Sequence, residues 1–153
     1  MDIAELEVAK YLGETDILSR YIDKTYTGTE EDYQTELLKA TTVYVGNLLR
    51  STTEEQLHMA FSQCGKVKRV IMGLDAKRFV PCGFAFVEFS HSSAALLSRR
   101  LLSRYSLNGR NIYVDIDSGF SENRQFGRGA GGGQIRDEFR DDPRARKKRR
   151  FYE

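Results

Sequence analysis

Three aromatic side chains are spaced so that they can share one face of a β-sheet. Residues 42–46 read TVYVG and residues 82–89 read CGFAFVEF, and both runs are rich in residues that favour strands. Because neighbouring side chains of a strand point to opposite faces, Tyr44, Phe84 and Phe86 are expected to point the same way. Leaving such rings exposed works against the ~1.5–3 kcal/mol that burying a phenylalanine contributes. We therefore predict an aromatic surface on which nucleobases stack, at about 1–3 kcal/mol per base.

Two carboxylates are predicted to lie beside these rings. Residues 111–117 read NIYVDID, and the alternation puts Tyr113, Asp115 and Asp117 on the aromatic face. Carboxylates repel phosphate, but they accept hydrogen bonds from the ring N–H and the amine of a guanine edge. They also favour a positively charged base such as N7-methylguanine. The plain alternative is a solvated strand end, or an aspartate that caps the following turn.

A charged base of this kind is held best between two rings. Cation–π attraction then adds to stacking, at about 2 kcal/mol or more when the site is desolvated. The tyrosines upstream of residue 41 are candidates for the second ring. The phosphates that follow such a base need basic groups, and Arg124, Arg128 and Arg136 are separated by glycines that let the backbone approach closely.

The elements that position these residues follow a split pattern. The predicted strands cover residues 42–46, 67–72, 83–89 and 111–117, with one helix between a Thr53 cap and Gly65 and another over residues 92–105. Asn108-Gly109 is typical of a turn. The order β-α-β-β-α-β predicts an α+β, ferredoxin-like fold, in which two helices back a four-stranded antiparallel sheet.

The chain divides into three parts that differ in charge. Residues 1–40 carry 4 basic and 10 acidic residues (net −6), whereas residues 41–117 and 118–153 each carry 10 and 6 (net +4). Residues 3–12 and 30–40 have helical spacing, which predicts a helical N-terminal extension. Residues 128–133 are glycine-rich, and residues 144–150 hold six basic residues, so the C-terminal extension is expected to be disordered when free. A polyanion is expected to contact the middle and tail.

Several classes of protein are disfavoured. No run of about 18 apolar residues is present, so we expect no membrane span. The cysteines, Cys64 and Cys82, and the histidines, His58 and His91, lack metal-ligand spacing, so we expect no metal. The glycine run lacks the Lys-Ser/Thr of a phosphate loop, and no nucleophile and base can be assembled. We expect neither a cofactor nor an enzyme.

The two strand signatures, VYVGNL at residues 43–48 and CGFAFVEF at residues 82–89, resemble those of the RNA recognition motif family. The second departs from that family at Cys82, where a lysine or arginine is usual. Over residues 21–142 the chain also resembles the family of small subunits of nuclear cap-binding complexes. That likeness rests on IMGLD at 71–75, DIDSGF at 115–120, RQFGRG at 124–129 and GQIRDEF at 133–139.

The second resemblance implies a role for each matching position. Tyr21 and Tyr44 would enclose the methylated base, and Phe84 and Phe86 would support the aromatic surface. Asp115, the main chain near Ile116, and Asp117 would hold the edge of the base. Further cap contacts are implied for Tyr113, Val114, Arg124, Gln125, Phe126, Gly127, Arg128, Gln134, Ile135 and Arg136. Ile116 replaces a tryptophan common in the family and Tyr113 replaces an arginine, which bears on cap affinity.

These resemblances imply a protein that binds the 7-methylguanosine cap of RNA polymerase II transcripts together with a large helical subunit. Such a protein would support RNA processing, splicing and export, and it would be nuclear and shuttle to the cytoplasm. Residues 146–150 fit a nuclear import signal, with an RNA-contacting tail as the alternative. A general single-stranded RNA-binding splicing factor is the alternative, and it has no use for Asp115 and Asp117. A module that binds a peptide on its sheet is a third possibility.

Overall fold

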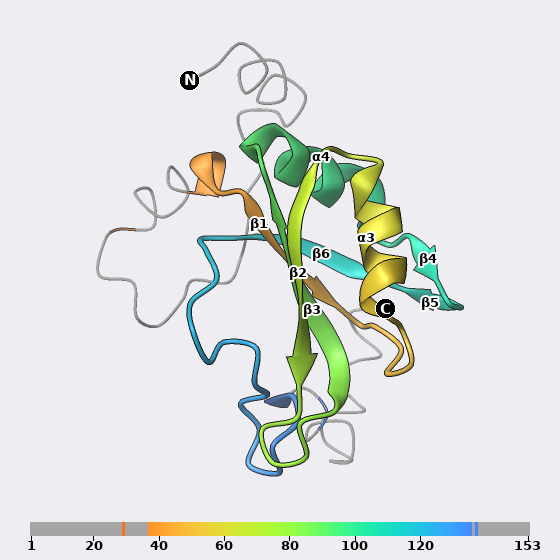
Figure 1. The fold of residues 1–153 in the computed structure, drawn as a ribbon, viewed down its shortest axis with the longest axis vertical. Helices are drawn as coiled ribbons and strands as arrows, with labels where there is room; N and C mark the ends of the chain where they lie inside the picture. The colour runs from red at the N-terminus through yellow and green to blue at the C-terminus, as the bar shows by residue number, and fades with distance from the viewer. Residues whose placement is uncertain (1–28, 30–36, 136, 138–153) are drawn as a thin grey trace.

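The computed structural model describes residue 29, residues 37–135 and residue 137. Here a four-stranded antiparallel sheet has the strand order β2-β3-β1-β6, and two helices cover one of its faces (Figure 1). The elements are β1 (Thr42–Gly46), α3 (Glu54–Ser62), β2 (Val67–Leu74), β3 (Pro81–Phe89), α4 (Ser92–Leu102), β4 (Ser106–Leu107), β5 (Arg110–Asn111) and β6 (Tyr113–Asp117). The predicted β-α-β-β-α-β order and the two-layer fold are confirmed.

The structure adds a short β4–β5 hairpin around the predicted Asn108-Gly109 turn. The second helix ends at Leu102, before its predicted end at residue 105. It ends there because the backbone is extended at Ser103 (ψ 126°) and left-handed at Arg104 (φ 70°). The strand predicted over residues 111–117 is divided at Ile112, which is buried and donates its amide to the carbonyl of Tyr105 at 2.9 Å.

The first helix begins as predicted. The Thr53 hydroxyl accepts from the amide of Gln56 at 3.2 Å, and the Gln56 carbonyl oxygen accepts from the amide of Thr53 at 3.0 Å. This reciprocal cap contributes about 0.5–2 kcal/mol. The helix buries Leu57, Ala60 and Phe61 against the sheet.

The sheet has two unlike faces. Beneath the helices, Val43, Val45 and Val87 are fully buried in the main core. On the opposite face Phe84 and Phe86 form a separate cluster with partly buried Tyr44. The predicted alternation is therefore confirmed on the central strands β1 and β3.

The expected exposure of the aromatic face is wrong for two of its three rings. Phe84 is 6% exposed and Phe86 is 3% exposed. The physical reason is that the chain after β6 does not leave the domain. It runs back beside the sheet to the turn between β2 and β3 (Figure 1), and Phe120 packs on Phe86 with ring centroids 5.6 Å apart.

Most of the predicted extensions lie outside the described residues. These include residues 3–12 and 30–36 of the predicted N-terminal helices, and the basic run at 144–150. Residues 37–39 are helical, and Leu37 is fully buried in the main core. The residues just before β1 therefore pack into the same core as the sheet.

Candidate nucleic-acid interface

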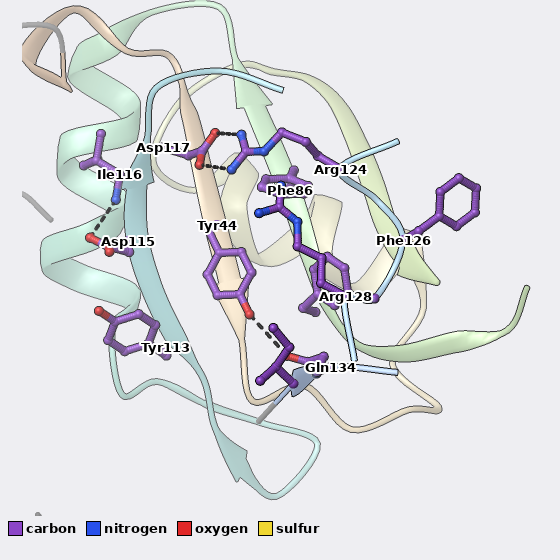
Figure 2. A pocket seen from close by; sticks show the side chains of 13 residues that line it. Tyr44, Phe86, Tyr113, Asp115, Ile116, Asp117, Arg124, Phe126, Arg128 and Gln134 are labelled. Carbon is purple, nitrogen blue, oxygen red and sulfur yellow. Dashed lines mark hydrogen bonds and ion pairs between the residues drawn. The ribbon is translucent and has the colours of Figure 1, made fainter. Parts of the chain in front are cut away.

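One cavity of about 360 Å³ lies on the sheet face opposite the helices. Its floor is the aromatic cluster, one wall is strand β6, and the other wall is the chain after β6 (Figure 2). Its lining residues are Tyr44, Phe84, Phe86, Tyr113, Asp115, Ile116, Asp117, Arg124, Phe126, Gly127, Arg128, Gln134 and Ile135. The volume suits a small flat ligand such as a nucleoside.

Tyr44 is the ring of the floor that keeps accessible surface. It lies nearly parallel to Phe84, with centroids 5.9 Å apart and planes at 26°, and edge-on to Phe86 at 5.8 Å. Phe84 in turn lies close over Gly73 of β2, where a Cβ would come within 2.4 Å of the ring. The two buried phenylalanines thus support Tyr44 from below, and the Tyr44 hydroxyl donates to the Gln134 side-chain oxygen at 3.3 Å.

Asp117 is held in a nearly buried ion pair. Its two oxygens accept from the Arg124 guanidinium at 2.5 and 2.7 Å, and Oδ2 also accepts from the amide of Gly119 at 3.0 Å. The guanidinium carbon lies 4.9 Å from the centre of the Phe86 ring. Asp117 therefore caps the turn after β6, as the plain alternative anticipated, while also lining the cavity.

Asp115 lies opposite Tyr44 in the β1–β6 register. Its Oδ1 accepts from the amide of Ile116 at 3.0 Å and lies 3.9 Å from Nε of Arg99. Arg99 belongs to α4 on the far side of the sheet, and it reaches Asp115 because β6 is an edge strand. The sequence carried no local signal for this contact, since it depends on how α4 packs at that edge.

The chain after β6 forms the second wall by pairing with the edge of β2. The Leu74 amide donates to the carbonyl of Gln125 at 2.7 Å, and the Gly127 amide donates to the carbonyl of Leu74 at 2.8 Å. Farther along, the Ala76 amide donates to the carbonyl of Gly132 at 2.7 Å. The glycines between Arg124 and Arg136 are predicted to let the backbone approach phosphate. In the structure, Gly127 and Gly132 let the backbone approach β2 and the turn that follows it.

The turn between β2 and β3 is organised by Asp75. Its side chain accepts from the amides of Arg78 and Lys77 at 3.0 and 2.9 Å, and these hydrogen bonds lower the pKa of the Asp75 carboxyl. Gly132 packs against this turn with a left-handed φ of 95°, and a Cβ there would lie 2.6 Å from Asp75 Oδ1. The turn and the glycine-rich segment therefore fit together only with a glycine at this position.

Replacing Gly132 with alanine is expected to lower the free energy of unfolding by about 1–3 kcal/mol, because it combines backbone strain with a clash. The cavity wall would also separate from β2, which limited proteolysis would detect as faster cleavage after residue 124. Gly109→Ala is the matched control, since Gly109 has a φ of 81° with nothing within 4 Å of the added Cβ. An equal loss of stability in both variants would mean that strain alone is responsible.

Cys82, which stands where the motif usually has a basic residue, is 5% exposed. Burial, aided by the charges of Asp75 and Asp137, raises the pKa of its thiol to about 11. Its backbone carbonyl accepts from the side-chain Nε2 of Gln134 at 2.8 Å. The position is therefore covered by the glycine-rich wall, and it has no room for an exposed phosphate contact.

The structure gathers most of the residues implied by the resemblance around this cavity. All thirteen lining residues are among them, and the side chain of Ile116 lies in the main core, so Ile116 faces the cavity through its main chain. Val114 is buried in the same core and does not line the cavity. Gln125 also does not line it, and its side-chain oxygen is buried without a hydrogen-bond partner in the described residues. Tyr21 and Arg136 lie outside the described residues.

Among the described residues, no three histidine, cysteine, aspartate or glutamate side chains are grouped so that they could hold a metal ion. None of the helices in this part of the chain has the length and apolar character needed to cross a membrane.

Comparisons with known proteins identify a family for the folded domain and relatives that are similar over most of the chain. Residues 43–113 match the model of the RNA recognition motif family. Nuclear cap-binding protein subunit 2 of Drosophila ananassae is 47% identical over 125 residues, covering 82% of this chain and 81% of that protein. The protein of the same name from Oryza sativa subsp. japonica is 46% identical over 82% of this chain and 51% of its own length. The solved RNA15 RNA recognition motif superposes with a TM-score of 0.47 at 29% identity, over 56% of this chain and 93% of that one.

Proposed function

The chain belongs to the family of nuclear cap-binding protein subunit 2, and from that premise we propose that it binds the 7-methylguanosine cap of nuclear RNA polymerase II transcripts. The observation that carries the proposal is the cavity in which the accessible ring of Tyr44 lies beside the carboxylates of Asp115 and Asp117. A neutral guanine gains stacking and hydrogen bonds from such a site, whereas a cationic base also gains cation–π attraction and the field of the carboxylates.

In the proposed complex the methylated base stacks on Tyr44, and its hydrogen-bonding edge faces β6. The carboxylates of Asp115 and Asp117 accept hydrogen bonds from that edge, and the main chain at Ile116 also contacts it. Tyr21 is proposed to close the stack from the other side. Arg128, Gln134 and Arg136 are proposed to hold the ribose and phosphates, and the cavity supports this role for Arg128 and Gln134, which line its outer wall.

The ion pair with Asp117 gives Arg124 a different role from the phosphate contact first expected. Its guanidinium is already held by both oxygens of Asp117 and by the Gly119 carbonyl at 2.6 Å. We propose that Arg124 fixes the Asp117 carboxylate and closes the wall of the cavity. Phosphate binding then falls to the basic groups farther along the chain.

A general single-stranded RNA binder is less well supported. Such a protein gains nothing from two carboxylates in its base site. It usually contacts phosphate through a basic residue at the position of Cys82, and that position is buried here. We propose no catalytic activity.

We further propose that the chain acts as the small subunit of a heterodimer with a large helical subunit, in RNA processing, splicing and export. It would be nuclear and would shuttle to the cytoplasm, with residues 146–150 contributing to import. Import of a reporter fused to residues 140–153 tests that point. A fusion that stays cytoplasmic would show that residues 146–150 are not an import signal, and the RNA-contacting tail would be the remaining interpretation.

A thermal shift assay tests cap binding without a label. A saturating methylated nucleoside triphosphate at about 100 times its Kd stabilises the folded state by roughly 2.7 kcal/mol, which raises Tm by several degrees. The unmethylated triphosphate at the same concentration is expected to raise Tm much less. Equal shifts for the two nucleotides would contradict the proposal.

The N-terminal extension, residues 1–40, and the C-terminal extension, residues 118–153, are expected to become ordered when cap and partner bind. Residues 37–40 and 118–135 already contact the domain. Amide hydrogens of residues 1–36 and 136–153 should exchange rapidly in the chain alone, and should become protected when the methylated nucleotide and the large subunit are added, because both segments are too polar to bury a core of their own. Hydrogen exchange with mass spectrometry measures this directly. Protection of both flanks in the isolated chain would show that they order without a ligand.

A further inference from the structure

An exposed phenylalanine projects from the turn that joins β2 and β3. Phe79 is 63% exposed, and its backbone is left-handed with a φ of 55°. A bulky residue rarely adopts this conformation, which costs about 1–2 kcal/mol relative to a right-handed one. The turn enforces it, because the Phe79 amide donates to the carbonyl of Asp75 at 2.8 Å and the Asp75 amide donates to the carbonyl of Val80 at 2.8 Å. The backbone conformation therefore gives no reason for a phenylalanine at this position.

This ring is continuous with the wall of the cavity. Phe79 packs edge-on against Phe126, with ring centroids 5.7 Å apart and planes at 80°. Phe126 lines the cavity, yet its ring points away from Tyr44 (Figure 2). Phe126 thus links the base site on one side of the wall with Phe79 on the other.

The surface around Phe79 is basic. Lys77 and Arg78 precede it and are exposed, and neither forms an ion pair with another residue in the described part of the chain. Arg128, which lines the cavity, is exposed as well. An aromatic face flanked by available cations is the arrangement that single-stranded nucleic acid uses, with bases on the ring and phosphates on the charges.

We propose that Phe79 stacks a base of the RNA strand that continues from the bound cap, and that Lys77 and Arg78 contact its phosphates. This extends the proposed function from a cap site to a cap-and-strand site, and it rests on that function. The strand would leave the cavity past Arg128 and cross the wall at Phe126. A peptide is disfavoured as the occupant, because the described residues of this surface offer one ring next to two cations, with no free strand edge or apolar groove.

Two substitutions separate the ring from its backbone. Phe79→Asn removes the ring but suits the left-handed conformation, and Phe79→Tyr keeps a ring that can stack. In the full-length chain, with the large subunit present, Phe79→Asn is expected to weaken binding of a short capped RNA about tenfold. The same variant should leave the affinity for the methylated nucleoside triphosphate within about twofold, since that ligand does not reach the turn. Leu101→Asn is the matched control, because Leu101 is 60% exposed on α4.

A tryptophan at position 79 gives a direct signal, because the chain has no other. Emission of Phe79→Trp should be quenched by the capped RNA and unchanged by the methylated nucleoside triphosphate. Equal affinity of wild type and Phe79→Asn for capped RNA, without quenching, would overturn the inference. A loss for both ligands would also overturn it, since Phe79 would then act only by supporting the cavity wall.

The proposed function can fail separately from this inference. In that case the wild-type chain would not distinguish methylated from unmethylated nucleotide. If uncapped RNA still quenched the tryptophan, Phe79 would stack bases without a cap. If it did not, both proposals would fall.

Discussion

Replacing Tyr44 with alanine is expected to weaken binding of a 7-methylguanosine cap about 100-fold, or roughly 2.7 kcal/mol. The loss combines stacking on one face with most of the cation–π attraction from that ring. Neither phenylalanine of the cluster can take its place, because Phe84 and Phe86 are 6% and 3% exposed and lie beneath Tyr44. An unmethylated nucleotide should lose only the stacking contribution, about tenfold.

Tyr44→Phe is the control for the ring. It keeps the aromatic face and removes the hydroxyl that donates to Gln134 at 3.3 Å, so we expect its affinity to fall no more than about threefold, the usual size of a weak, partly buried hydrogen bond. Circular dichroism would confirm that both variants fold. If Tyr44→Phe lost as much affinity as Tyr44→Ala, the hydroxyl and its link to Gln134 would be responsible rather than stacking.

Replacing Asp115 and Asp117 together with asparagine should remove most discrimination between methylated and unmethylated caps. Asparagine keeps the size of the side chain but loses the charge that favours a cationic base, and its amide presents donors where the guanine edge also has donors. The preference for the methylated cap is therefore expected to fall from about 100-fold to within about threefold. Competition between the two caps measures the ratio in one experiment.

The pair between Asp117 and Arg124 complicates the double variant, because Asp117→Asn also leaves the guanidinium without its carboxylate. Removing one member of a nearly buried pair typically costs about 3–5 kcal/mol, and the residual exposure of these side chains, 13% and 7%, reduces that figure. Arg124→Met is the matched control, since it breaks the same pair and keeps the carboxylate. It should lower stability but retain the methyl preference. If Arg124→Met also lost the preference, Asp117 would act by holding the wall rather than by contacting the base.

The elements of the fold could be predicted because their signals are local. The Thr53 cap, the period-2 alternation of β1 and β3, and the Asn108-Gly109 turn are each specified within a few residues. The same alternation placed Tyr44 with the phenylalanines and Asp115 with Asp117 on one face. The elements and the polarity of the cavity thus follow from patterns of neighbouring residues.

The features that could not be predicted depend on contacts distant in sequence. The path of residues 118–135 is set by pairing with the edge of β2 and by the pair between Arg124 and Asp117, and a glycine-rich composition indicates neither. Burial of Phe84 and Phe86 follows from that path. Arg99 is near Asp115 because α4 packs at the edge strand β6, and the exposure of Phe79 depends on the hydrogen bonds of the Asp75 turn.

The central claim is that the cavity recognises the positive charge of a methylated guanine. It is tested most directly by titrating a fluorescent cap analogue against the full-length chain, alone and with the large subunit, in competition with unlabelled methylated and unmethylated caps. A methylated cap that competes about 100-fold better, or roughly 2.7 kcal/mol, is the result we predict. Equal competition by the two caps would contradict the claim, and the aromatic surface would then serve general RNA binding.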